Sequence, residues 1–280
     1  MEVSLSNKDL FNIFDLSNKY YVITGGLGFL GRKFTETVCK YNGNPIIIDI
    51  KNNKDDNKFL KKLTNKYEKD ILHFAIDITN EKEILKLSNK FSKNKLSIAG
   101  LVNNAAINPV SSKLNNKDFY LENFSINQLQ KEFDIGIKGS LICTKIFGNL
   151  MAKNKFGSIV NISSDLGIIA PNHSIYNSSN KNYKNVKPVS YSIIKSGIIG
   201  LTKYTSTYWG KDNIRCNSIA PAGVFNKQNK KFVSKLEALI PMNRMLNIDE
   251  LSGSLIFLLS NASTYVNGHT LIIDGGRTIW

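Results

Sequence analysis

Residues 20–31 read Tyr-Tyr-Val-Ile-Thr-Gly-Gly-Leu-Gly-Phe-Leu-Gly. The first five residues predict a short buried strand, and a helix is expected to follow the glycines as far as about residue 41. From Gly26 on, the stretch matches the pattern Gly-x-Gly-x-x-Gly. Glycines let a backbone bend sharply and approach a pyrophosphate, whose charge is met by free N–H groups and by the positive end of the helix dipole. The stretch therefore predicts a dinucleotide-binding turn, with a glycine turn that binds no ligand as the plainer alternative.

Asp49 ends the next β-branched run, at the distance from the glycines where a dinucleotide-binding unit carries an acidic residue. A carboxylate there accepts hydrogen bonds from the adenosine ribose and repels a 2′-phosphate. We therefore expect NAD as the cofactor, with NADP disfavoured. The alternative for Asp49 taken alone is an ordinary polar residue at a strand end.

Strand and helix patterns alternate along the rest of the chain. Further apolar runs typical of buried strands lie at residues 45–50, 71–76, 98–103, 158–162, 214–219 and 270–273. Helical patterns are clear at residues 126–153, 189–209 and 248–260. Strands without polar alternation need helices on both faces, and right-handed crossovers make such a sheet doubly wound. We predict the α/β class with a single-domain, doubly wound parallel sheet of seven strands, the Rossmann fold, over residues 20–280. Residues 1–19 are expected to be an N-terminal extension.

The chain has 280 residues and a formal net charge of +15. Only four of its 37 basic residues are arginines, and the lysines are spread along the chain, so we expect a solvated basic surface rather than a nucleic-acid site. An anionic substrate would also be attracted by this charge. No apolar run is long enough to cross a bilayer and no signal peptide is evident, which predicts a cytoplasmic protein without a membrane partner. The cysteines, Cys39, Cys143 and Cys216, are too scattered for a disulfide framework or a metal site.

Tyr191 and Lys195 open a predicted helix, and their spacing of four residues puts both on one helical face. A free tyrosine has a pKa near 10, which is too high for proton transfer at neutral pH. A neighbouring ammonium group stabilises the phenolate and lowers that pKa. The pair is therefore a candidate for acid/base chemistry, although an exposed pair with no chemical role has the same spacing.

Taken together, these motifs resemble those of the short-chain dehydrogenase/reductase family. The resemblance extends from Thr24 to Gly276 and includes the glycine turn and the Tyr-x-x-x-Lys segment. Its other elements are Asp77-Ile78, Asn103-Asn104-Ala105-Ala106, Asn161-Ile162-Ser163-Ser164, Asn217-Ser218-Ile219-Ala220-Pro221-Ala222-Gly223 and Asp274-Gly275-Gly276.

The resemblance implies the roles of individual residues. Tyr191 would be the general acid/base, Lys195 would lower its pKa and bind the nicotinamide ribose, and Ser164 would hydrogen-bond the reacting oxygen of the substrate. Ser163 would then face the core or cap the turn, and Ser178 or Ser179 is the alternative to Ser164. The cofactor-binding residues implied are Gly25, Gly28, Phe29, Leu30, Gly31, Asp49, Asp77, Ile78, Asn103, Ala105, Tyr191, Lys195, Pro221 and Val224. No metal is expected.

The sequence departs from the family pattern at three places. Ser164 and Tyr191 are 27 residues apart, about twice the usual spacing, so residues 172–187 are expected to form an inserted loop beside the substrate. Gly136 stands where the family has the asparagine of a proton relay; backbone and water could replace that side chain, another polar residue could, or activity could be impaired. The glycine spacing looks like that of the extended branch, while the downstream motifs look classical. Residues 223–242 are expected to be a substrate lid.

This mixture is similar to a subgroup of bacterial enzymes of flagellin or surface-sugar modification. The resemblance implies an NAD(P)-dependent oxidoreductase that interconverts a secondary alcohol and a ketone, on a small substrate that is sugar-like or anionic. A nucleotide-sugar epimerase or dehydratase is the enzymatic alternative, and a catalytically weakened NAD-binding sensor is the non-enzymatic one. A homo-tetramer or homo-dimer is implied, formed through the helices at residues 126–153 and 189–209.

Overall fold

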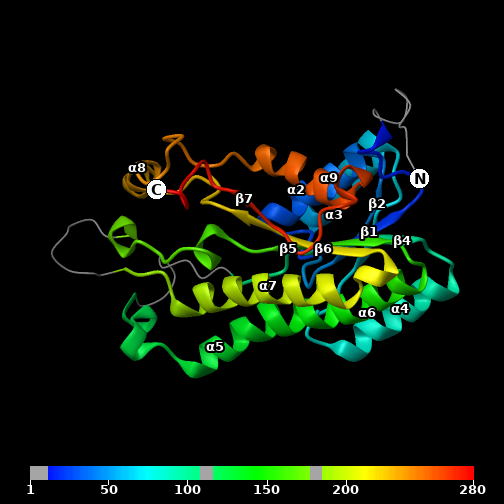
Figure 1. Ribbon diagram of the computed structural model, residues 1–280, viewed down its shortest axis with the longest axis horizontal. Coiled ribbons are helices and arrows are strands. Elements are labelled where there is room, and N and C mark those ends of the chain that lie inside the picture. The colour runs from blue at the N-terminus through cyan, green and yellow to red at the C-terminus, as the bar shows by residue number, and fades with distance from the viewer. Residues whose placement is uncertain (1–11, 108–115, 177–184) are drawn as a thin grey trace.

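The chain folds around one parallel sheet, which lies between two layers of helices in the computed structural model (Figure 1). The structure describes residues 12–107, 116–176 and 185–280. Within these residues the sheet has seven strands in the order β3-β2-β1-β4-β5-β6-β7, and all pairings are parallel. The strands are β1 (Tyr20–Thr24), β2 (Asn44–Ile48), β3 (Leu72–Phe74), β4 (Ile98–Asn103), β5 (Gly157–Ile162), β6 (Ile214–Pro221) and β7 (Thr270–Ile273). The predicted seven-stranded Rossmann fold is confirmed.

Two hydrophobic clusters fill the spaces between the sheet and its helices. Successive strand residues alternate between them: Val22 packs in the cluster under α4 (Glu81–Lys93) and α6 (Ser140–Lys153), and Ile23 packs in the cluster under α2 (Phe29–Lys40) and α9 (Leu251–Leu259). The remaining helices are α3 (Lys54–Tyr67), α5 (Ile126–Phe133), α7 (Val189–Tyr208) and α8 (Lys230–Glu237). Because both faces are covered by apolar side chains, the strands need no polar alternation, as the sequence indicated.

The predicted helix at residues 126–153 is interrupted. A π-helical turn, Asp134–Gly139, separates α5 from α6. Its two glycines meet large neighbours: a Cβ on Gly136 would lie 2.6 Å from Cγ2 of Ile194 in α7, and one on Gly139 would lie 2.5 Å from Cδ1 of Ile78. The absence of side chains lets this turn approach α7 and the end of the sheet closely, which hydrophobic periodicity does not reveal.

Other boundaries differ by small amounts from those expected. The second strand ends at Ile48 instead of residue 50, the sixth continues to Pro221, and the last predicted helix begins with a 3₁₀ turn, Ile248–Glu250. Helix α8 was not predicted and lies within the expected lid, residues 223–242. No helix of the described ranges is long and apolar enough to span a membrane.

Some expectations lie outside the described residues. They are most of the N-terminal extension (residues 1–11), part of the loop after β4 (residues 108–115) and the middle of the insertion (residues 177–184), which includes Ser178 and Ser179.

Candidate active site

The glycine turn joins β1 to α2 at the carboxyl edge of the sheet. Gly25 has φ +62°, a conformation that glycine adopts at little cost, and a Cβ there would lie 2.9 Å from Cα of Ala105. A Cβ on Gly31 would lie only 1.9 Å from the carbonyl oxygen of Gly25. Helix α2 can therefore begin directly beside the turn only because residue 31 is glycine.

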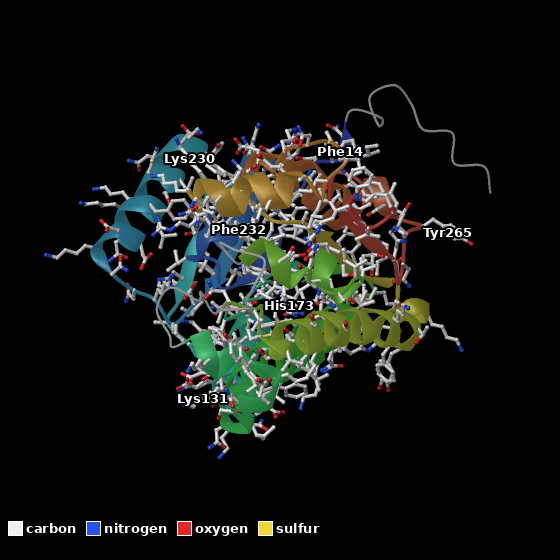
Figure 2. All side chains as sticks on the ribbon, turned by 90° about the vertical axis from the view of Figure 1, so that its left-hand side faces the viewer. Phe14, Lys131, His173, Lys230, Phe232 and Tyr265 are labelled. Atoms are coloured by element: carbon white, nitrogen blue, oxygen red, sulfur yellow. The ribbon has the colours of Figure 1, made fainter. Side chains whose placement is uncertain are left out.

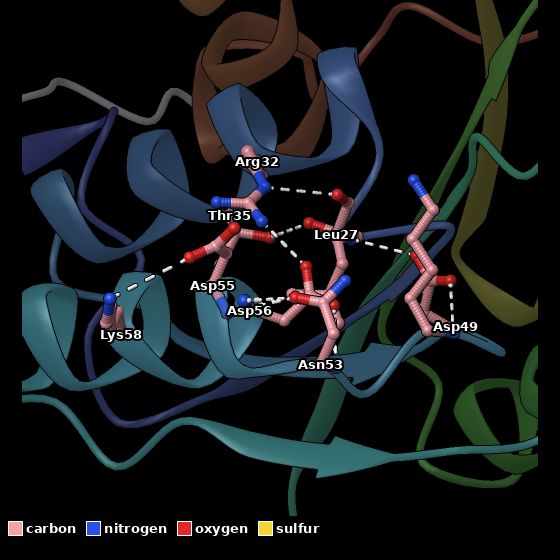
Figure 3. Close-up of polar contacts among 10 residues, drawn as sticks. Leu27, Arg32, Thr35, Asp49, Asn53, Asp55, Asp56 and Lys58 are labelled. Atoms are coloured by element: carbon pink, nitrogen blue, oxygen red, sulfur yellow. Dashed lines mark hydrogen bonds and ion pairs between the residues drawn. The ribbon is translucent and has the colours of Figure 1, made fainter.

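Asp49 fixes the turn from the end of the neighbouring strand (Figure 3). Its Oδ2 accepts a hydrogen bond of 3.0 Å from the Leu27 N–H, and its Oδ1 accepts one of 3.0 Å from the Lys51 N–H. Arg32 ties the same turn to α3, because its Nε donates to the Leu27 carbonyl at 3.1 Å and its Nη2 pairs with Asp56 at 2.6 Å. The ion pair between Arg32 and Asp56 was not predicted from the sequence. Each residue lies in a stretch with a helical pattern, and that pattern does not indicate that the two side chains meet.

A cavity of about 1240 Å³ extends from this turn across the carboxyl ends of the strands. At one end it is lined by Asp49 and Asp77, and at the other by Tyr191 and the segments of the expected lid. Twelve of the fourteen residues expected to bind the cofactor line it: Gly25, Gly28, Phe29, Leu30, Asp49, Asp77, Ile78, Ala105, Tyr191, Lys195, Pro221 and Val224.

Two expected cofactor-binding residues, Gly31 and Asn103, do not line the cavity. Gly31 contributes by its lack of a side chain, as described above. Asn103 is buried in the sheet, where its Nδ2 donates to Oγ1 of Thr144 at 2.9 Å and to Oδ1 of Asn161 at 2.8 Å. The Asn103 amide thus connects β4, β5 and α6, and the role of Asn103 in binding the cofactor stays a prediction.

The residue that faces the cavity at the end of β4 is Asn104, which the sequence analysis quoted without giving it a role. Its Nδ2 donates to the carbonyls of Thr24 and Gly25 at 3.1 and 3.0 Å. The Thr24 hydroxyl in turn accepts the N–H groups of Asn104 and Ala105. These bonds hold the ends of β1 and β4 together at the bottom of the cavity.

Ser164, Tyr191 and Lys195 come together at the other end of the cavity. Ser164 is the second residue after β5 and hydrogen-bonds Tyr191, which lies in the first turn of α7. The Lys195 ammonium lies 5.8 Å from the centroid of the Tyr191 ring and donates to the carbonyl of Ile162 at 2.8 Å. Ser163 also lines the cavity, but its hydroxyl is buried and donates to the Lys195 carbonyl at 2.8 Å.

Burial governs the protonation of this group of side chains. It raises the pKa of Tyr191, a change that the hydrogen bond with Ser164 opposes and the charge of Asp165 reinforces. Burial also lowers the pKa of Lys195 to about 8, with a further lowering from the charge of Lys187. Burial therefore dominates the pKa of Tyr191 in the protein alone, and the expected lowering of that pKa by Lys195 stays a prediction.

Lys187 is a second lysine at Tyr191 that the sequence analysis did not single out. It comes from the last position of the insertion, and its ammonium lies 3.8 Å from the centroid of the Tyr191 ring. Burial lowers its pKa to about 8, against the opposing charges of Glu132 and Asp165. Its position in the insertion predicted that it lies near the substrate. The sequence gave no reason to prefer it over the other lysines of that loop, Lys181 and Lys184.

The insertion and the expected lid pack against each other. The 3₁₀ turn His173–Tyr176 belongs to the insertion, and Figure 2 shows it beside α8, on which Lys230 and Phe232 are labelled. The rings of Tyr176 and Phe232 lie with centroids 5.5 Å apart, over a small hydrophobic cluster formed by Ile175, Leu236, Ile240 and Met245. The two segments together form the outer wall of the cavity.

The geometry fits an extended dinucleotide with one reactive end. The glycine turn and the first turn of α2 supply backbone N–H groups beside the cavity, and Asp49 and Asp77 lie at the ends of β2 and β3. A phenol, a hydroxyl and an ammonium group meet at the far end. Across the described ranges, no three His, Cys, Asp or Glu side chains are grouped so that they could hold a metal ion.

The chain is similar to known proteins over almost its whole length. Residues 30–278 match the family described as enoyl-(acyl carrier protein) reductase. The post-translational flagellin modification protein A of Campylobacter coli is 28% identical, over 93% of this chain and 98% of that protein. The NAD-dependent glycerol dehydrogenase of Listeria innocua is 26% identical, over 95% of this chain and 96% of that protein. The crystal structure of a short-chain dehydrogenase from Leptospira borgpetersenii with bound NAD⁺ is 28% identical, covers 100% of this chain and 98% of that chain, and has a TM-score of 0.82.

Proposed function

Because this chain belongs to the short-chain dehydrogenase/reductase family, we propose that it is an NAD-dependent oxidoreductase that interconverts a secondary alcohol and a ketone on a sugar-derived substrate. The observation that carries the proposal is the meeting of Ser164, Tyr191 and Lys195 at one end of a cavity whose other end is the glycine turn. A surface-glycan or flagellin pathway is the proposed setting, supported by the similarity to the flagellin modification protein.

The proposed reaction needs one proton and one hydride to leave the same carbinol. Bound NAD supplies the hydride acceptor. Tyr191 takes the hydroxyl proton as general base, and returns it as general acid in the reverse direction. Ser164 donates a hydrogen bond to the reacting oxygen of the substrate. The Lys195 ammonium contributes positive charge beside the phenol and is the group that binds the ribose of the cofactor.

We propose NAD rather than NADP because of the position of Asp49. Its carboxylate is held at the cavity by two backbone N–H groups and is 7% exposed, so it cannot easily turn away from a 2′-phosphate. A bound 2′-phosphate would bring a second anion to the same place, at a cost that salt screens little in a buried site.

The substrate end of the cavity supports a polar, anionic substrate. Lys187, Lys227 and Lys231 line this end, together with the amides of Gln228 and Asn229. Amide groups suit the hydroxyls of a sugar, and the lysines suit a carboxylate or phosphate attached to it.

Two alternatives follow from particular features. An epimerase or dehydratase would use the same acid/base residues but regenerate its cofactor within one cycle. A sensor without catalysis is suggested by Gly136, where Ile194 fills the space that a relay side chain would need. The retention of all three side chains at the reactive end favours the oxidoreductase over the sensor.

We also propose that the protein works in the cytoplasm as a homo-oligomer. Large apolar side chains are exposed along one layer of helices, on α5, α6 and α7: Ile126, Phe133, Leu141, Ile193, Tyr204 and Tyr208. Large apolar side chains exposed on neighbouring helices are typical of an interaction surface, and here the proposed partner is a second copy of the chain.

A screen for NADH formation tests the proposal. The purified protein is incubated with NAD⁺ and a panel of polyols, sugars, sugar acids and sugar phosphates, and absorbance at the NADH band is followed. Net NADH formation with one class supports the oxidoreductase. Conversion of a nucleotide sugar without net NADH supports the epimerase or dehydratase, and binding of NAD⁺ with no conversion of any compound supports the sensor.

A further inference from the structure

A buried ion pair lies directly behind Ser164. Asp165 and Arg277 are joined by a bond of 2.5 Å between Nη1 and Oδ2, and both side chains are nearly inaccessible, with 3% and 6% exposed. The other carboxylate oxygen of Asp165, Oδ1, lies 2.8 Å from the Ser164 hydroxyl oxygen. Asp165 therefore has a catalytic-site hydroxyl on one oxygen and a guanidinium on the other.

The direction of each hydrogen bond in this group follows from the donors available. An ionised carboxylate can only accept, so Ser164 must donate its single hydroxyl hydrogen to Asp165. The Ser164 oxygen accepts from the Leu166 N–H at 3.2 Å, which leaves it one further lone pair. The Tyr191 oxygen is a second acceptor for the same hydroxyl hydrogen, because the hydrogen bond of Tyr191 with Ser164 lowers the pKa of Tyr191, as a bond donated to the phenolate does.

Arg277 is held in place by the local structure of the C-terminal segment. The carboxylate of Asp274 accepts the N–H groups of Gly276 and Thr278 at 2.9 and 2.7 Å. Gly275 and Gly276 have φ +64° and +91°, so the chain can turn back toward the cavity after β7. The Asp-Gly-Gly motif noted in the sequence therefore forms a turn that places the side chain of the next residue, Arg277, beside Asp165.

We propose that Asp165, held by Arg277, is a positioning residue that fixes the Ser164 hydroxyl beside the Tyr191 phenol. Ser164 donates to one carboxylate oxygen of Asp165, and Arg277 donates to the other. This inference rests on the proposed function, because it assigns a task within the same site.

The charges around the Tyr191 phenol determine what each variant should do. Lys187 and Lys195 face its ring from the insertion and from α7. Tyr176 lies near it in the first part of the insertion, and Asp165 lies near it in the 3₁₀ turn after β5. Removing the negative charge of Asp165 favours the phenolate and lowers the pKa of Tyr191.

Removing the positive charge of Arg277 should shift the pKa of Tyr191 in the opposite direction. It leaves the Asp165 carboxylate uncompensated near the phenol and raises the pKa of Tyr191.

The test compares Asp165→Asn with Arg277→Met. Tyrosines are labelled with ¹³C at Cζ, the Tyr191 signal is assigned by its loss in Tyr191→Phe, and its titration is followed in the protein without substrate. We expect the titration to move down by about one pH unit in Asp165→Asn and up by about one unit in Arg277→Met. Shifts of the same sign, or no shift in either, would overturn the proposal.

Two further variants separate positioning from stability. Arg277→Lys keeps the positive charge but loses the planar guanidinium group. The double variant Asp165→Asn/Arg277→Gln replaces the ion pair by two neutral amides. Neither leaves a buried charge without a partner, so both can be titrated if a single variant does not fold. Glu250→Gln removes a carboxylate paired with Arg244 away from the cavity, and should leave the Tyr191 titration unchanged.

Turnover supplies a second, separate readout. Asp165→Asn should lower kcat on an identified substrate by about a hundredfold with KM little changed, because the catalytic hydroxyls lose their orientation. An unchanged kcat in Asp165→Asn would contradict the positioning role. Absence of any NAD-linked turnover in the wild type would instead contradict the proposed function, and the titration would still decide the inference.

Discussion

The ring of Tyr191 lies against one ammonium group and within reach of a second. Lys187 and Lys195 are both held where burial disfavours their charged forms, and each has its pKa lowered to about 8 from an ordinary value of 10.5. Two buried cations with a shared neighbour are costly for stability, which is the usual sign of a site selected for its chemistry.

This cost should appear in the pH dependence of stability. Between about pH 8 and 10.5 the unfolded chain holds a proton on each lysine that the folded chain has lost, so these groups make the free energy of unfolding rise with pH in that window. Lys187→Met removes one such group and relieves the charge that lowers the pKa of the other. We expect the wild type to gain stability relative to Lys187→Met as pH rises from 8 to 10.5.

Urea denaturation at several pH values measures this difference. Lys230→Met, a change at an exposed lysine on α8, is the matched control and should follow the wild type. A Lys187→Met curve parallel to that of the wild type throughout the window would contradict the assigned environment of Lys187.

For single residues, the sequence predicted those positions that follow from the spacing along one helix or strand. Tyr191 and Lys195 lie on one turn of α7, and Asp49 lies at the end of β2, so their proximity to the cavity could be anticipated. Asn103 and Asn104 are adjacent and chemically identical, and only the twist of β4 decides which one faces the cavity. Asp165 and Arg277 are 112 positions apart, so nothing local could have paired them.

The unit formed by β1, the glycine turn and α2 depends on close approach of backbone atoms. Gly31→Ala would place a Cβ 1.9 Å from the Gly25 carbonyl, whereas Gly28→Ala would place one at 3.2 Å from the same oxygen. We expect Gly31→Ala to cost at least about 2 kcal/mol of stability, because backbone must move, and Gly28→Ala to cost no more than about 1 kcal/mol.

Thermal or urea unfolding compares the two variants, and NAD⁺ titration by calorimetry follows binding. Gly28 lines the cavity and Gly31 does not, so Gly28→Ala should weaken NAD⁺ binding more than it weakens folding. Equal losses of stability in the two variants would contradict the close approach of α2 to the turn.

Element boundaries show what periodicity can and cannot predict. The alternation of strand and helix predicted a doubly wound parallel sheet of seven strands, because buried strands and amphipathic helices have distinct patterns. The π-helical turn at Asp134–Gly139 is invisible to such patterns, since it depends on Ile78 and Ile194 from other elements. Helix α8 was missed because its eight residues have too few apolar positions to stand out in a polar loop.

For the whole molecule, the exposed apolar side chains are unevenly distributed over the surface. Tyr204 and Tyr208 stack on each other at the end of α7 with 67% and 63% of their surface exposed, and Leu141 of α6 is 49% exposed. The proposed oligomer would bury these residues.

We expect the protein to run as a dimer or tetramer in size-exclusion chromatography with light scattering, and Tyr204→Glu to shift it to a smaller species. Tyr265→Glu is the control, because Tyr265 is fully exposed outside the helices α5–α7. A wild type that is monomeric at micromolar concentration, or one whose assembly is indifferent to Tyr204→Glu, would contradict the proposed interface.

The central claim is that Tyr191 transfers the proton in an NAD-linked oxidation. The most direct measurement is the steady-state rate of NADH formation by wild type and Tyr191→Phe on the substrate found in the screen, with NAD⁺ affinity measured in parallel. The account predicts a loss of at least about a hundredfold in kcat with NAD⁺ affinity nearly unchanged. A Tyr191→Phe enzyme that turns over at close to the wild-type rate would contradict it.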